Sequence, residues 1–232
     1  MQKTVTFFII MLNLLIFVMM FIFGGFGAYD SAASLLRFGA QNGIIVASGD
    51  WFRTITSMFV HGGFLHLFFN MYALFYFGNM VERIYGKYKY LSVYVISGFV
   101  GNLLTQFLMP TAYSVGASGA IFGLIGLLFG QGFRHDTPNM LKPVTGTALL
   151  PVIIINVILG FTVPSVNNFA HIGGLAAGFT FGWLTPVTFN KRTWNIWKVV
   201  FYVLVAFIAL CYVLLLISNI KYRFFIIPSM GR

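Results

Sequence analysis

The sequence predicts an all-α polytopic membrane protein with six or seven transmembrane helices. Composition is the first reason: 59% of the 232 residues are apolar and only 8% are charged, whereas soluble domains carry roughly 25% charged residues. Pattern is the second reason, because the apolar residues gather in runs of about 20, the length of a helix that crosses a bilayer. The lipid bilayer is therefore the first partner that the sequence implies.

The apolar runs define the expected elements in order. The first run is longer than the apolar core of a signal peptide, about 7–15 residues, so we expect it to be retained as a span. The Gly24–Gly63 stretch that follows is polar and rich in glycine, which predicts a long first loop. We expect one domain over residues 1–232, with spans at 5–26, 64–81, 91–109, 117–133, 143–163, 170–187 and 196–217.

The charge distribution predicts the orientation. The formal charge is +10, and the basic residues lie in short clusters between apolar runs, which is typical of topology signals and not of a nucleic-acid-binding face. Nine of the 14 share the side of the N-terminus, which predicts a cell-membrane protein with a cytoplasmic N-terminus and an extracytoplasmic C-terminus. These nine are Lys3, Arg83, Lys87, Lys89, Arg134, Lys142, Lys191, Arg192 and Lys198.

Carboxylates and cysteine exclude several kinds of site. None of the four carboxylates falls in the middle of a predicted span, which argues against a cation- or proton-coupled transporter. The H-E-x-x-H zinc motif is absent, and a single cysteine, Cys211, forms neither an internal disulfide nor a cysteine cluster. We therefore expect no metal and no cofactor.

Four polar residues do enter the predicted spans. His66 and Asn70 lie in the second span, Ser118 begins the fourth, and His171 begins the sixth. These three spans run in the same direction, so their starts share one leaflet. At 1.5 Å per residue the four side chains lie roughly 18–24 Å from the inner interface, several ångströms below the outer surface of the hydrocarbon. His61 is expected at the interface and His135 in solvent.

Glycines follow both Ser118 and His171 at helical spacing. Faces without side chains let membrane helices pack backbone to backbone, which would bring Ser118 within hydrogen-bond reach of His171. A hydroxyl beside an imidazole is the minimal activated nucleophile. His171 would accept the Ser118 proton, and His66, Asn70 and the Ser118 backbone N–H would stabilise an oxyanion. Taken alone, Ser118 and Asn70 are explained more simply by helix packing, and His171 alone fits a structural and a functional role equally well. Only their combination favours catalysis. The glycines are Gly119, Gly123, Gly126 and Gly130, then Gly174, Gly178 and Gly182.

These residues resemble the rhomboid family of intramembrane serine proteases. The run Gly116–Gly119 resembles its G-x-S-G nucleophile motif, and His66 with Asn70 resembles its H-x-x-x-N. Ala170-His171, with the glycines after it, resembles its A-H-x-x-G-x-x-x-G. Two positions depart from the family pattern. Its Trp-Arg pair is approximate here, because Phe52 separates Trp51 from Arg53, and Phe122 stands where some members carry a tyrosine.

The resemblance implies a six-helix core at about 5–187 and an added helix at about 196–217. It also implies a serine endopeptidase that cuts single-span membrane proteins near the outer face, with the fifth span and residues 161–169 as its gate. Three alternatives stay open: a rhomboid-like protein that binds clients without cutting, a channel or transporter, and a zinc site of His61, His66 and His171. The residues that the resemblance places in support of the site are Gly116, Gly119, Gly123, Phe122, Gly174, Gly178, Arg53 and Glu82.

Overall fold

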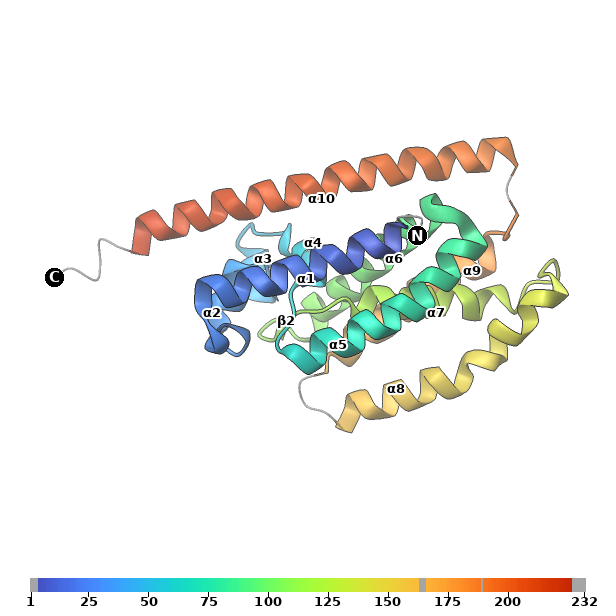
Figure 1. Cartoon of the computed structure of the whole chain (residues 1–232), viewed down its shortest axis with the longest axis horizontal. Coiled ribbons are helices and arrows are strands. Elements are labelled where there is room, and N and C mark those ends of the chain that lie inside the picture. Colours follow the sequence, from blue (N-terminus) through green and yellow to red (C-terminus); the bar gives the residue numbers. More distant parts are fainter. Residues whose placement is uncertain (1–3, 163–165, 189, 227–232) are drawn as a thin grey trace.

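The computed structural model describes residues 4–162, 166–188 and 190–226, with side chains as far as residue 221. The described residues are mostly helical, and four helical segments are long and apolar enough to cross a membrane. The prediction of an all-α multi-pass membrane protein is confirmed. Figure 1 shows the long helix α10 (Lys191–Ile226) along one flank of the bundle and α8 (Leu150–Thr162) on the opposite flank. Residues 163–165 of the predicted gate lie outside the described residues.

The first helix, α1 (Val5–Gly24), begins at a doubly capped N-terminus. The Thr4 hydroxyl accepts a hydrogen bond from Phe7 N at 3.1 Å. The Glu82 carboxylate accepts from Val5 N and Thr6 N, each at 2.8 Å. A carboxylate at this position satisfies orphan N–H groups and favours the positive end of the helix dipole. Glu82 therefore joins the end of the second span to the start of the first.

The long first loop is folded, although the sequence predicted only that it does not span. Two residues of it, β1 (Gln41–Asn42), pair antiparallel with β2 (Tyr113–Ser114), which stands just before the fourth span. The loop is therefore attached to the chain that leads into Ser118. Its helical turns are η1 (Phe26–Tyr29), α2 (Ala32–Arg37), α3 (Gly43–Ala47), α4 (Arg53–Thr56) and η2 (Ser57–Phe59).

The predicted second and third spans form one helical run with a break. The run comprises α5 (Phe64–Ala73), the π-helical η3 (Leu74–Gly78) and α6 (Asn79–Leu108). Gly86 interrupts it with φ of 74° and ψ of 160°, a backbone conformation that glycine tolerates best. Residues on the two sides of Gly86 lie close together, because a Cβ built on Gly78 would stand 3.1 Å from the Tyr90 hydroxyl. The chain therefore folds back on itself at this break.

The fourth span is a short helix in the centre of the fold. It is α7 (Ser118–Gln131), and its 14 residues extend about 21 Å, less than the roughly 30 Å of hydrocarbon. Nearly all its residues are buried, because α6 and α9 (Asn168–Leu184) pack against it. Because α7 is shorter than the hydrocarbon is thick, its start at Ser118 is compatible with the predicted position below the membrane surface.

The fifth and the seventh predicted spans differ from the structure at their ends. The fifth was expected over 143–163, but two 3₁₀ turns, η4 (Asn139–Val144) and η5 (Gly146–Leu149), precede α8 (Leu150–Thr162). Pro143 and the positive φ of Gly146 explain why the α-helix starts later. The seventh was expected over 196–217 and extends over Lys191–Ile226 as α10, since neither glycine nor proline interrupts this stretch.

Candidate active site

Helices α7 and α9 contact each other through their glycines, as the sequence predicted. A Cβ on Gly119 would lie 3.1 Å from the Ala170 carbonyl oxygen. A Cβ on Gly174 would overlap the Gly119 carbonyl, and one on Gly178 would overlap the Gly123 carbonyl. The two backbones therefore touch along the interface, which only glycine permits. This close approach brings the first turn of α7 beside the first turn of α9.

Ser118 and His171 occupy those two first turns. Ser118 is the first residue of α7 and is half-buried, while His171 is the fourth residue of α9 and is buried. The His171 ring stacks on Phe122, with ring centroids 4.3 Å apart and planes 13° apart. Phe122 lies one turn after Ser118 on the same helix face, and its side chain leans back toward the N-terminus. The imidazole therefore lies on the face of α7 that carries Ser118.

No hydrogen bond links Ser118 Oγ to His171 within the part of the chain that the structure describes. The His171 Nδ1 atom is buried and has no partner among these residues. Catalytic hydrogen bonds are often long without substrate and tighten when it binds. The pairing of Ser118 with His171 therefore stays a prediction, for which the stacked ring supplies the orientation.

His66 and Asn70 approach the same turn from α5. Gly116, two residues before Ser118, has φ of 112°, and a Cβ there would lie 2.7 Å from His66 Nε2 and 3.9 Å from Asn70 Nδ2. Asn70 Nδ2 donates one hydrogen bond to the His66 carbonyl at 2.9 Å. An amide nitrogen carries two hydrogens, so a second donor remains near the Gly116–Ser118 turn. Glycine at 116 is required both by its positive φ and by the two side chains that cover it.

Glu82 and Arg53 lie away from this turn. Glu82 caps α1, and Arg53 is buried in the first loop. Arg53 Nε pairs with Asp50 Oδ2 at 2.8 Å, and Arg53 Nη1 donates to the carbonyls of Leu36 and Ala40. Both charges therefore hold backbone segments together and do not face Ser118. Trp51, next to the approximate motif, stacks on Phe207 of α10.

Four polar residues that the sequence analysis did not single out form a hydrogen-bond network beside the site. They are Ser57, Asn102, Ser114 and Asn167. Asn102 Nδ2 donates to Ser57 Oγ at 3.0 Å, and the Ser57 carbonyl accepts from Gly116 N at 3.0 Å. Asn167 Nδ2 donates to Ser114 Oγ at 3.0 Å, while the side-chain Oδ1 of Asn167 caps α9 by accepting from Ala170 N. Ser114 Oγ donates to Asn102 Oδ1, which closes the network. Asn102 is a polar residue inside a predicted span, and that signal would have found it.

His61, which was expected at the membrane interface, has a side chain that is fully buried within the protein. Its ring centroid lies 5.0 Å from that of His66, edge to face. Burial, with a smaller contribution from His66, lowers the pKa of His61 to about 3, so the ring is neutral at pH 7. Among the described residues, no three histidine, cysteine or acidic side chains converge as metal ligands, so this arrangement does not support the three-histidine alternative. His135 is exposed, as predicted.

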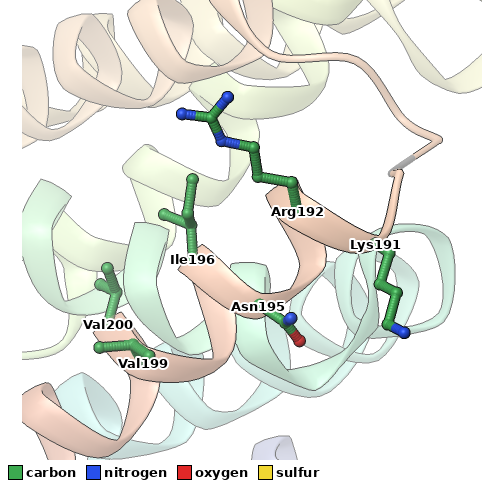
Figure 2. A pocket seen from close by; sticks show the side chains of 6 residues that line it. All are labelled: Lys191, Arg192, Asn195, Ile196, Val199 and Val200. Carbon is green, nitrogen blue, oxygen red and sulfur yellow. The ribbon is translucent and has the colours of Figure 1, made fainter.

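A separate pocket of about 700 Å³ lies at the start of α10 (Figure 2). Two basic side chains, Lys191 and Arg192, lie at the start of the helix, and Asn195 and three aliphatic side chains line the rest of the pocket. It includes none of the residues predicted for the site. The candidate active site is therefore the Gly116–Ser118 turn with His171, and not this surface.

Comparison with known proteins gives the chain its relatives. The family model for the Rhomboid domain matches residues 48–188. Rhomboid protease GluP of Bacillus subtilis (strain 168) is 38% identical over 178 residues, which cover 77% of this chain and 34% of that protein. RHOMBOID-like protein 4 of Arabidopsis thaliana is 39% identical over 140 residues, which cover 60% of this chain and 35% of that protein. Putative rhomboid protease YdcA of B. subtilis is 39% identical over 149 residues, which cover 63% of this chain and 73% of that protein. The chain thus spans about a third of the first two relatives.

Proposed function

The chain belongs to the rhomboid family, and from this premise we propose that it is an intramembrane serine endopeptidase with a Ser118–His171 dyad. The observation that carries the proposal is the His171 ring, which is stacked on Phe122 at 4.3 Å on the Ser118 face of α7. Relatives that are named proteases, GluP and YdcA, support the same class of reaction. The substrates that we propose are single-span membrane proteins, cut near the outer face of the bilayer.

The proposed reaction starts with Ser118. His171 accepts the hydroxyl proton while Ser118 Oγ attacks the carbonyl carbon of the scissile peptide bond. The resulting oxyanion receives hydrogen bonds from the Ser118 backbone N–H, from the second Asn70 Nδ2 hydrogen and from His66. His171 then donates its proton to the leaving amine, and a water molecule hydrolyses the acyl-enzyme by the same proton transfers. No metal or cofactor takes part in these steps.

The depth of the site agrees with a substrate that is itself a membrane helix. Backbone amides of an intact helix are bonded internally, so the segment must unwind before a peptide bond reaches Ser118. Ser118 begins a helix of about 21 Å inside roughly 30 Å of hydrocarbon, which leaves unwound backbone near one face of the bilayer. Small or helix-breaking residues at the cut would make that unwinding less costly.

The test uses the purified full chain and a labelled single-span substrate. Ser118→Ala and His171→Ala are expected to abolish cleavage, because each removes one member of the dyad. Ser92→Ala is the matched control, since it removes another buried hydroxyl, one that donates to the Tyr88 carbonyl within α6. A fluorophosphonate probe should label the wild type and the control but not Ser118→Ala.

Two outcomes would contradict the proposal. Cleavage by Ser118→Ala or His171→Ala at the wild-type rate would show that the dyad is wrong. A wild-type protein that binds the substrate but neither cuts it nor reacts with the probe would instead be a rhomboid-like client-binding protein.

A further inference from the structure

The seventh helix is attached to the first loop at three points, although it lies beyond the residues 48–188 that match the family. Ser218 Oγ donates to Asp50 Oδ2 at 2.9 Å. The Trp51 and Phe207 rings stack with centroids 5.7 Å apart and planes 16° apart. Asn219 Nδ2 donates to the Arg37 carbonyl at 2.8 Å. These contacts join α10 to both ends of the loop segment 37–51, whose middle is held by α6 through the hydrogen bonds of Asn102 and Gln106.

Asp50 links α10 to the interior of the first loop, because its carboxylate contacts both Ser218 and Arg53. The oxygen that accepts from Ser218 also pairs with Arg53 Nε at 2.8 Å, and the Arg53 and Asp50 side chains are only 3% and 14% exposed. Arg53 in turn donates to the carbonyls of Leu36 and Ala40. Charge-assisted hydrogen bonds are shorter and stronger than neutral ones. Ser218 therefore helps to orient the carboxylate that orients Arg53.

From Arg53 the connection continues to the Gly116–Ser118 turn, here called the nucleophile turn. Arg53 begins α4 (Arg53–Thr56), and Ser57 is the first residue after this helix. The Ser57 carbonyl accepts a hydrogen bond from Gly116 N at 3.0 Å. The pairing of Gln41 with Ser114 holds the same turn from the other side. Gly116 has φ of 112°, one of the many conformations open to glycine, so contacts from outside the turn are what select it. The first loop supplies those contacts, and α10 holds the first loop.

From this continuous set of contacts we propose that α10 positions the nucleophile turn, with Ser218 and Asp50 as positioning residues for Ser118. The proposal rests on the proposed proteolytic function for its kinetic consequence but not for its structural one. When the Ser218 hydrogen bond is lost, Asp50 and α4 shift, and the Ser57 carbonyl no longer holds Gly116 at its place. Ser118 is then misplaced relative to His171, which lowers kcat more than it changes KM.

The experiment compares Ser218→Ala with Ser218→Thr, which keeps the hydroxyl, in the full-length protein. Ser218→Ala is expected to lower kcat about tenfold, less than the roughly 10²-fold cost of a 1 Å misplacement, with KM within about twofold. Ser218→Thr should retain kcat. Ser48→Ala is the matched control, because the exposed Ser48 hydroxyl in the same loop donates only to the Ile44 carbonyl.

A second pair of variants tests the same link at the carboxylate. Asp50→Asn keeps the shape but removes the charge that pairs with Arg53, and a larger fall in kcat is expected. Asp136→Asn is its control, because it breaks the exposed pair of Asp136 with Arg134. In both sets, amide hydrogen exchange over residues 113–118 should accelerate in the Ser218→Ala and Asp50→Asn proteins and stay unchanged in the controls.

The two readouts separate the possible failures. A wild-type protein without proteolysis or probe labelling contradicts the proposed function, and the exchange measurement then still decides the positioning role. Wild-type kcat and wild-type exchange in Ser218→Ala would overturn the positioning role. So would equal losses of kcat in Ser218→Ala and Ser218→Thr, because the hydroxyl would then not be what matters.

Discussion

At the scale of single residues, donors near the Gly116–Ser118 turn decide how an oxyanion is stabilised. Asn70 Nδ2 donates one of its two hydrogens to the His66 carbonyl. The same nitrogen lies 3.9 Å from the position of a Cβ built on Gly116, so its second hydrogen is available beside this turn. The bond to His66 fixes the amide plane, because a carbonyl partner accepts only from the nitrogen. In a site of low dielectric, a donor fixed in this way contributes more than it would in water.

We expect Asn70→Ala to reduce kcat by roughly 10²-fold, the usual cost of one oxyanion donor, with a smaller change in KM. Steady-state kinetics on a labelled single-span substrate measure both parameters. Asn79→Ala is the matched control, because Asn79 Nδ2 donates to the carbonyl four residues back, as Asn70 does, but further along the same helical run. A loss of equal size in both variants would assign Asn70 to helix structure and not to the oxyanion.

At the scale of elements, the α7–α9 contact is what places the site. Glycines on one helix meet carbonyl oxygens of the other at every turn, from Gly119 against Ala170 to Gly182 against Leu127. The contact is made by backbone atoms, so it leaves no flexible side chain that can move aside. An added methyl group must therefore separate the helices, and with them the first turns that carry Ser118 and His171.

We expect Gly178→Ala to destabilise the protein by about 1–3 kcal/mol, the usual cost of overpacking, because its Cβ would overlap the Gly123 carbonyl. Thermal unfolding in detergent measures this loss. Gly27→Ala is the control, since a Cβ there meets nothing within 4 Å. Both changes reduce the entropy of the unfolded chain equally, so their difference reports the interface. A Gly178→Ala protein as stable as the control would contradict the close packing.

At the scale of the whole molecule, the charges and the long helix α10 define the relation to the bilayer. The 36 residues of α10 extend about 54 Å, more than the roughly 30 Å of hydrocarbon, so both of its ends reach past the apolar layer. Its first residues, Lys191 and Arg192, are exposed. Nine of the 14 basic residues fall on this side of the predicted topology, which is why we propose that it is cytoplasmic.

Cysteine labelling of intact cells tests this orientation. Cys211 is fully buried, so the native thiol should give little background with a membrane-impermeant maleimide. Ala33→Cys, at an exposed position of the first loop, should be labelled from outside. Lys142→Cys, exposed in the loop between the fourth and fifth spans, should be labelled only after permeabilisation. The reverse pattern would place the N-terminus outside.

Particular residues show how far the sequence alone reaches. Ser118, His171, His66 and Asn70 were predicted as one group because each is polar inside an apolar run. In the structure His66 and Asn70 lie beside Gly116, and His171 stacks on Phe122, one turn after Ser118. Their grouping as a catalytic site stays a prediction. The glycine faces were predicted because helical spacing is periodic and local. Asn102 carries the same signal and was overlooked. The burial of His61 was not predicted, because a position before a span does not indicate which other segments of the chain will cover the side chain.

The sequence itself determined the class of protein, since hydropathy and helical periodicity are properties of neighbouring residues. It also predicted the spans and the candidate chemistry. Only the tertiary structure decided that the first loop is folded, that Glu82 caps α1, and that Ser218 holds Asp50. The last contact joins residues 168 positions apart. No local pattern records such a pairing, because each partner is an ordinary polar residue until the fold brings the two together.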